Sequence, residues 1–204
     1  MRTRPDPGGL PEKNSNPLER GPRYRRRMPQ LIAPTPRLHA SWLAAHAEWA
    51  PGGDPGRAGL WLAAEGDDFT DPEVFAGWVA LLRDQAGHAR PLPGGRVPTA
   101  HWWIAEHGIV LGAIDLRHAL DAFLSEAGGH VGYSVRPSAR RRGLATWALG
   151  TVLPEARLLG LDRLLLVCDA ANTASARVIV RNGGVLEDVR TTRHGVKNRY
   201  WIDL

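Results

Sequence analysis

A basic turn between an extended segment and an apolar helix is the part of this sequence best suited to chemistry. The run Val135-Arg-Pro-Ser-Ala-Arg-Arg-Arg-Gly143 ends a predicted strand at Pro137 and leads directly into the helix. The first four N–H groups of a helix have no partner within it, and the helix dipole places its positive end there. A phosphate or pyrophosphate fits such a place. The predicted members of this anion site are Arg140, Arg141, Arg142, Gly143, Leu144, Ala145 and Thr146.

Two small residues keep the turn open to an anion. Gly143 lacks the Cβ that would hold an anion away, and Ala145 keeps the next helical turn slim. The turn has neither the GK[ST] of a Walker loop nor the GxGxxG of a dinucleotide-binding fold. A solvated run of arginines is the alternative interpretation, but the position between a strand end and a helix start favours phosphate binding.

The elements around this turn alternate between strands and helices. A strand over 130–135, a helix over 143–159 and a strand over 163–168 predict a parallel pair of strands. Other strands are expected at 30–33, 100–105, 108–116, 185–191 and 198–203, and other helices at 37–49, 70–83, 118–126 and 173–181. The predicted fold class is α/β, with a mixed, mostly antiparallel central sheet and helices on both faces.

Composition excludes several classes of protein. The chain has 204 residues, 43% of them hydrophobic and 23% charged, which is typical of a globular domain. No apolar run reaches 18 residues, and the first thirty residues lack the apolar stretch of a secretory signal. Cys168 is the single cysteine, so an internal disulfide or a Cys-rich zinc site is excluded, and the histidines show no metal-ligand spacing. We expect a cytoplasmic protein without a membrane partner or a metal.

The positive charge is concentrated in the first 27 residues. They contain eight basic and three acidic side chains, whereas the other 177 residues contain 18 of each. We therefore expect a disordered basic leader over 1–27 and one folded domain over 28–204, with Met28 as a candidate for the true start. An arm that contacts phosphates is the alternative, but the neutral body disfavours nucleic acid as a partner.

The order of these elements and the residues of the turn resemble the GNAT superfamily of acetyl-CoA-dependent N-acyltransferases. The family signature V-x-P-x-x-(R/Q)-x-x-G-x-(G/A) is met by Val135, Pro137, Arg140, Gly143 and Ala145. About thirty residues later the family has an Asn that opens a helix ending in Gly, and here the segment 172–184 has that pattern. The resemblance covers residues 100–204 well and reaches back to position 28 more loosely.

Three shorter runs look like a subgroup of bacterial acetyltransferases. They are Asp115-Leu-Arg-His118, Gly128-Gly-His130-Val-Gly-Tyr133 and Arg199-Tyr-Trp-Ile202. The first run could also shape an acceptor pocket, with Asp115 binding a cationic amine and Arg117 an acidic group.

The resemblance implies a role for each part of the site. The N–H groups of 141–146 would bind the CoA pyrophosphate, and the strands at 130–135 and 163–168 would splay apart so that pantetheine lies between them. A main-chain N–H near Val135 would hold the thioester carbonyl and then the oxyanion. Asn172 and Ser175 would contact the pantetheine arm.

Proton transfer is where this chain departs from the family pattern. Many relatives have a Tyr seven residues after the Asn as the acid, and here that position is Ile179. Tyr133 and Tyr200 are the substitutes that the sequence offers. His130 and His118 are the candidate bases, because imidazole titrates near neutral pH. The alternative is that His130 packs at a strand end and His118 begins a helix.

The resemblance implies transfer of an acetyl group from acetyl-CoA to a primary amine by direct attack in a ternary complex. We expect a small metabolite as the acceptor, because the neutral body gives no reason to choose a highly cationic one. A protein N-terminus or lysine is the alternative acceptor. A second alternative is a domain that binds acyl-CoA and senses it without turnover, since the usual Tyr is absent.

Overall fold

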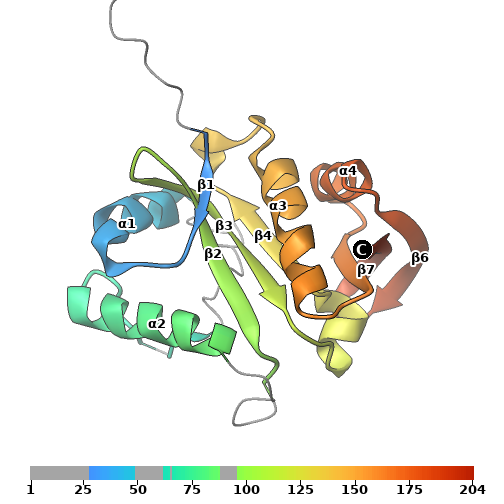
Figure 1. The fold of residues 1–204 in the computed structure, drawn as a ribbon, viewed down its shortest axis with the longest axis horizontal. Coiled ribbons are helices and arrows are strands. Elements are labelled where there is room, and N and C mark those ends of the chain that lie inside the picture. Colours follow the sequence, from blue (N-terminus) through green and yellow to red (C-terminus); the bar gives the residue numbers. More distant parts are fainter. Residues whose placement is uncertain (1–27, 49–61, 65, 88–95) are drawn as a thin grey trace, which may run out of the picture.

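Two antiparallel sheets form the framework of the molecule in the computed structural model, which describes residues 28–48, 62–64, 66–87 and 96–204 (Figure 1). The predicted leader, residues 1–27, lies outside the described residues. The first sheet has the order β1 (Gln30–Ile32), β2 (Thr99–Glu106), β3 (Ile109–Arg117), β4 (Val131–Val135). The second has the order β5 (Arg163–Asp169), β7 (Gly195–Asp203), β6 (Val185–Thr192).

In the described part of the chain, four α-helices connect and cover these strands. They are α1 (His39–Glu48), α2 (Pro72–Asp84), α3 (Leu144–Leu158) and α4 (Thr173–Arg181). The α2 start follows from local chemistry, because the Asp71 side chain accepts the N–H of Glu73 at 2.7 Å and proline fits the first helical turn. Single turns lie at η1 (Pro36–Leu38), η3 (Gln85–Gly87) and η6 (Pro137–Ala139). None of the described helices is long and apolar enough to cross a membrane.

Each face of the first sheet has its own apolar core. The helices α1 and α2 cover one face, where Trp42, Phe75 and Trp78 pack against Trp103 of β2 (Figure 1). The helix α3 covers the other face, where Ala148 and Leu149 pack in one core with β3, β4 and β5 residues. We call these the α1 side and the α3 side of the sheet.

The junction of the two sheets lies between β4 and β5. The strand–helix–strand order predicted a parallel pair here, splayed at the cofactor cleft, and these are the edges at which the two sheets meet. Among the described residues no ladder pairs β4 with β5. His130 links them at one end, since its N–H donates to the Leu165 carbonyl at 2.7 Å and its Nδ1 accepts the Leu165 N–H at 2.8 Å. Beyond this link the two strands are splayed.

One predicted helix is wrong in its range and type. The sequence predicted a helix over 118–126, but the structure has a short helical segment that ends in a π-helix, η5 (Leu124–Gly128). The Leu124 N–H donates to the Asp121 side chain at 2.7 Å at its start. Gly129, with φ +68°, ends it, because the chain must turn there toward β4.

Candidate active site

A cleft of about 1510 Å³ opens where β4 and β5 splay apart. Tyr133 and Val135 of β4 line it from the α3 side, because both pack against the α3-side core. Gly132 and Ser134 also line it, and alternation along the strand places them on the α1 side. The cleft therefore has lining residues from both the α1 side and the α3 side of the sheet.

The edge of β4 faces this cleft with its main chain. The Arg117 N–H donates to the His130 carbonyl, and the Arg136 N–H donates to the Leu111 carbonyl, which fixes the phase of the β3–β4 ladder. In an antiparallel ladder alternate residues bond to the partner strand. The N–H and carbonyl groups of Tyr133 and Val135 therefore point away from β3 and toward β5. An extended ligand can pair with such an edge as an added strand.

The start of α3 forms one wall of the cleft and is open to an anion. Gly143 is its N-cap, has φ +78°, and makes no side-chain capping bond. The first bond within the helix runs from the Trp147 N–H to the Gly143 carbonyl at 2.9 Å, so the N–H groups before it have no intrahelical acceptor. Gly143, Leu144, Ala145 and Thr146 all line the cleft.

The backbone conformation at position 143, rather than a lack of room for a side chain, explains why a glycine stands there. A Cβ at this position would meet no atom within 4 Å, but the left-handed φ is one that side chains rarely adopt. Arg141 also has a left-handed φ, +63°. Left-handed residues within a turn are a feature of anion-binding nests, in which successive N–H groups face one anion.

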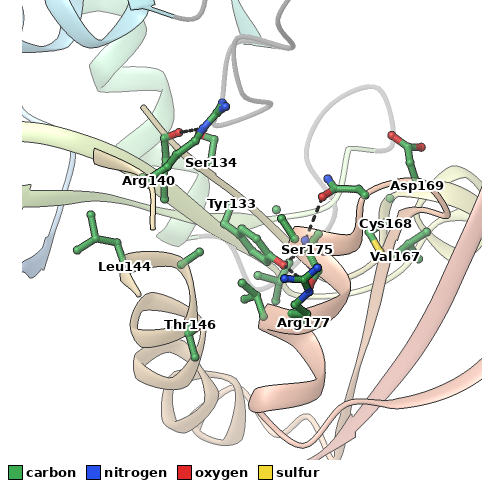
Figure 2. A pocket seen from close by; sticks show the side chains of 18 of the residues that line it. Tyr133, Ser134, Arg140, Leu144, Thr146, Val167, Cys168, Asp169, Ser175 and Arg177 are labelled. Atoms are coloured by element: carbon green, nitrogen blue, oxygen red, sulfur yellow. Dashed lines mark hydrogen bonds between the residues drawn. The ribbon is translucent and has the colours of Figure 1, made fainter. Parts of the chain in front are cut away.

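The three arginines of the turn have different surroundings. Arg141 is exposed and lines the cleft. Arg140 lines it too, and its Nε donates to the Val135 carbonyl at 3.1 Å, which ties the turn to the end of β4 (Figure 2). Arg142 instead pairs with Glu106 of β2 at 2.7 Å and is not among the lining residues that the structure describes. The structure thus brings all of the predicted anion turn to the cleft except this side chain.

The opposite wall is the helix α4. Its N-cap, Asn172, accepts the Ser175 N–H at 3.0 Å, and both residues line the cleft as predicted. Arg177 and Arg181 also line it and are exposed. Sequence reasoning missed these two arginines. Their spacing of four residues on a predicted helix, which places them on one face, was the available signal.

Tyr133 reaches across the cleft to α4. Its hydroxyl lies 2.6 Å from the Ser175 Oγ and 3.3 Å from the Ser175 carbonyl oxygen, to which it donates (Figure 2). Burial raises the pKa of Tyr133 to about 12. Cys168 lines the cleft beside this pair, and burial raises the pKa of its thiol as well, so the neutral thiol is favoured.

The two predicted histidines lie away from this pair. His130 is buried at the sheet junction, where its Nδ1 already accepts the Leu165 N–H, and burial lowers its pKa to about 4. His118 is half-buried after β3, and burial lowers its pKa too. Neither is among the described residues that line the cleft. The imidazole that does line it is His194, in the β6–β7 turn, which sequence reasoning did not single out.

The position of the family's usual tyrosine is part of the core. Ile179 is 1% exposed, and a Cβ at the neighbouring Gly184 would come within 2.3 Å of its side chain. The other substitute, Tyr200, is buried in the α3-side core, and burial raises the pKa of its hydroxyl. Of the tyrosines that the structure describes, Tyr133 is the one that lines the cleft.

Solved structures share this architecture. The microcin C7 self-immunity acetyltransferase MccE, in complex with acetyl-CoA and AMP, aligns with a TM-score of 0.60 and 14% identity over 87% of this chain and 93% of its own. RimJ of Mycobacterium smegmatis, in complex with CoA-disulfide, aligns with a TM-score of 0.62 and 19% identity over 86% of each chain. The Salmonella typhimurium enzyme that modifies the N-terminal serine of ribosomal protein L7/L12 aligns with a TM-score of 0.55 and 18% identity over 87% of this chain and 96% of its own.

The family match rests on the sequence itself. No curated protein matches the chain significantly. The family model described as "Acetyltransferase (GNAT) domain" matches residues 18–185, which is most of the chain and includes the α3 turn and α4. The splayed strands, the anion turn and this match together show that the chain belongs to the GNAT acetyltransferase family.

Proposed function

We propose that the protein transfers the acetyl group of acetyl-CoA to a primary amine of a small metabolite, by direct attack within a ternary complex. One observation supports this most strongly: the open start of α3 and the unladdered edge of β4 face the same cleft. An acyl donor with a pyrophosphate and an extended arm needs both of these features at once.

The donor's phosphates would lie at the start of α3. The N–H groups at 141–146 would donate hydrogen bonds to the pyrophosphate oxygens, and the exposed guanidinium groups of Arg141, Arg177 and Arg181 would add charge from both walls. Each phosphate contact gains from the helix dipole as well as from the side chains. The pantetheine arm would run along β4 between Tyr133 and the Asn172–Ser175 turn.

The reacting carbonyl would lie near Val135, where the β4 main chain faces the cleft. The amine nitrogen attacks the carbonyl carbon, the new C–N bond forms, and the carbonyl oxygen takes up negative charge. A main-chain N–H near Val135 would stabilise that oxyanion. The carbonyl then re-forms as the C–S bond breaks, the leaving thiolate of CoA takes a proton from an acid in the cleft, and the amine nitrogen loses its extra proton to water.

Tyr133 is the acid that the geometry favours for the leaving thiolate. Its pKa of about 12 keeps the phenol protonated throughout the physiological range. Ser175 lies 2.6 Å from the phenol oxygen and holds it in the cleft. Neither His130 nor His118 is among the described residues that line the cleft, so we assign His130 a positioning role at the sheet junction.

The acceptor class has one alternative with a specific observation behind it. The Salmonella typhimurium neighbour modifies a protein N-terminus, so a protein N-terminal amine is a second candidate acceptor. A cleft of about 1510 Å³ that is lined from both sides of the sheet has room for either kind of amine beside the donor. A non-catalytic acyl-CoA sensor is the remaining alternative.

The test is release of free CoA thiol from acetyl-CoA across a panel of small amines and peptides with free or blocked N-termini. Our proposal predicts release with a small amine and an acetylated product confirmed by mass spectrometry. Release with free N-terminal peptides alone would favour the protein acceptor. Tight binding of acetyl-CoA without release for any amine would show a sensor and contradict the transfer reaction.

A further inference from the structure

The three shorter sequence runs, 115–118, 128–133 and 199–202, meet at the π-helix Leu124–Gly128. Arg117 of the first run donates from Nη1 to the carbonyls of Gly128 and Gly129, at 3.3 and 3.2 Å. Arg199 of the third run donates to the Ser125 carbonyl. A π-helix has poorer internal hydrogen bonding than an α-helix, so two buried arginines that bind its carbonyls hold it in place.

The glycines of the second run make this arrangement possible. A Cβ at Gly129 would lie 2.7 Å from the Leu165 carbonyl oxygen, so a side chain there would push η5 away from β5. A Cβ at Gly128 would lie 2.6 Å from the Leu124 side chain. The π-helix is therefore clamped against the sheet junction, at one end of the cleft.

The clamped helix faces the cleft on the α1 side. Phe123, Leu124 and Ala127 line the cleft, and so does Arg117 beside them. Arg117 and Asp115 alternate with Ile114 and Leu116, which belong to the α3-side core, so both point to the other face. The donor's phosphates would enter from the α3 side. The part of the cleft beside η5, on the α1 side, is then available to the acceptor, and we call it the acceptor mouth.

An aromatic pair forms the rim of this mouth. The Phe123 ring lies 5.1 Å from the His194 ring in an edge-on arrangement, and both residues line the cleft. They come from η5 and from the β6–β7 turn, which the sequence separates by 71 positions. Phe123 is 45% exposed, so about half of a large apolar side chain is available to a ligand.

The carboxylates that line the cleft, and Asp115 beside it, already have basic partners. Asp115 pairs with Arg117 at 3.1 Å, Asp169 pairs with Lys197, and Glu48 pairs with Arg136. Asp169 and Glu48 are the carboxylates that line the cleft among the described residues, and a polycation would have to displace their partners to bind them. An apolar group instead gains from the free face of Phe123.

We propose that the π-helix clamped by Arg117 and Arg199 is the acceptor wall, and that it selects a small primary amine carried on an uncharged aromatic or branched apolar frame. This inference rests on the proposed acetyl transfer. Phe123 contacts the frame of the amine and is a specificity residue. Arg117 acts through η5 and is a positioning residue.

The test measures kcat/KM with saturating acetyl-CoA for 2-phenylethylamine, isoamylamine, spermidine and a lysine-rich peptide. We expect the two apolar amines to exceed both cationic acceptors by about tenfold or more, the size of one well-packed apolar contact. We expect Phe123→Ala to raise KM for 2-phenylethylamine about tenfold and to leave the KM for acetyl-CoA unchanged. Leu158→Ala is the matched control, because Leu158 is 82% exposed on α3 and is not a lining residue in the described part of the chain.

The outcomes separate this inference from the transfer reaction. If spermidine or the peptide is the better acceptor, the proposed acetyl transfer is supported but the assignment of an apolar amine as the acceptor is wrong. If Phe123→Ala leaves the KM of every acceptor unchanged, the assignment of η5 as the acceptor wall is wrong. If no amine releases CoA although acetyl-CoA binds, both the reaction and the acceptor assignment fail. Arg117→Lys should raise the acceptor KM more than it lowers kcat. A general folding defect would instead raise the KM for acetyl-CoA as much as the KM for the acceptor.

Discussion

The Tyr133 hydroxyl lies 2.6 Å from the Ser175 Oγ, so a hydrogen bond joins the edge of the first sheet to the start of α4 inside the cleft (Figure 2). Asn172 accepts the Ser175 N–H from the same turn. The Tyr133 phenol is thus held by Ser175, whose own N–H is bonded to the helix cap Asn172. At this point β4 pairs with β3 on one edge, and no ladder of the described residues pairs its other edge with β5. A proton donor fixed in this way needs little reorganisation during the reaction.

Tyr133→Phe removes that proton donor and leaves the ring in place. We expect kcat to fall about 100-fold, the lower range for loss of an acid, with the Kd for acetyl-CoA little changed. Tyr200→Phe is the control, because Tyr200 is buried in the core away from the cleft. Full activity of Tyr133→Phe would contradict the assignment.

The pH profile gives a second measure of the same group. Burial holds the pKa of Tyr133 at about 12, so the phenol stays protonated as the pH rises to 10. We therefore expect no loss of kcat from Tyr133 ionisation between pH 7 and pH 10. A descending limb in that range that disappears in Tyr133→Phe would show a much lower pKa than the structure implies.

The arginines of α4 should matter for donor binding. Arg177→Ala combined with Arg181→Ala should raise the KM for acetyl-CoA about fivefold at low salt, because exposed charge contacts contribute roughly 0.2–1 kcal/mol each. The effect should shrink in 0.5 M salt, since exposed charges are screened. Arg190→Ala is the control, because Arg190 is exposed on β6 and pairs with Asp188 at 2.6 Å. Equal effects of the control and the double variant would contradict the phosphate role.

His130 should affect stability more than chemistry. Burial lowers its pKa to about 4, so between pH 6.5 and pH 4 the unfolded chain takes up the proton first, and stability falls as the pH falls through that window. His101 adds to this fall, because burial lowers its pKa to about 3. His130→Ala should leave the Leu165 N–H unpaired, cost about 1–3 kcal/mol at pH 7, and weaken the pH dependence.

Urea unfolding at pH 7 and pH 5 checks this prediction. The control is His107→Asn, at an exposed turn with φ +53° that Asn tolerates. A His130→Ala protein with wild-type stability at both pH values, but with much reduced kcat, would favour a catalytic histidine instead.

The sequence predicted the donor half of this molecule well because that half depends on local patterns. Strand periodicity, Pro137 and the apolar helix after Gly143 lie within a few residues of one another, and α4 begins and ends where Asn172 and the apolar spacing predicted. The prediction of Arg142 at the cleft was not met, because Glu106 of the β2–β3 hairpin pairs with it instead. No local pattern could reveal that partner.

The acceptor half depends on long-range contacts, which the sequence does not express. The helix predicted over 118–126 is a π-helix at 124–128, because Arg117 and Arg199 bind its carbonyls from two different strands. His194 reaches the cleft through the β6–β7 turn, far from any recognised motif. The sequence alone could not distinguish a buried structural His130 from a reactive one, because either would stand at the same end of the predicted strand 130–135.

The most direct test of donor binding at α3 is thermal unfolding of the wild type, Gly143→Glu and Gly160→Glu, each with and without acetyl-CoA. Both glycines have nearly the same left-handed φ, +78° and +77°, and both have open space for a Cβ, so the backbone strain is matched. Gly143 begins α3 at the cleft, whereas Gly160 follows its far end.

Acetyl-CoA at a hundred times its Kd should stabilise the wild type and Gly160→Glu by about 2.7 kcal/mol. Gly143→Glu should lose this stabilisation, because its carboxylate occupies the anion site. Equal stabilisation of all three proteins, or of none while the wild type is folded, would contradict donor binding at this turn.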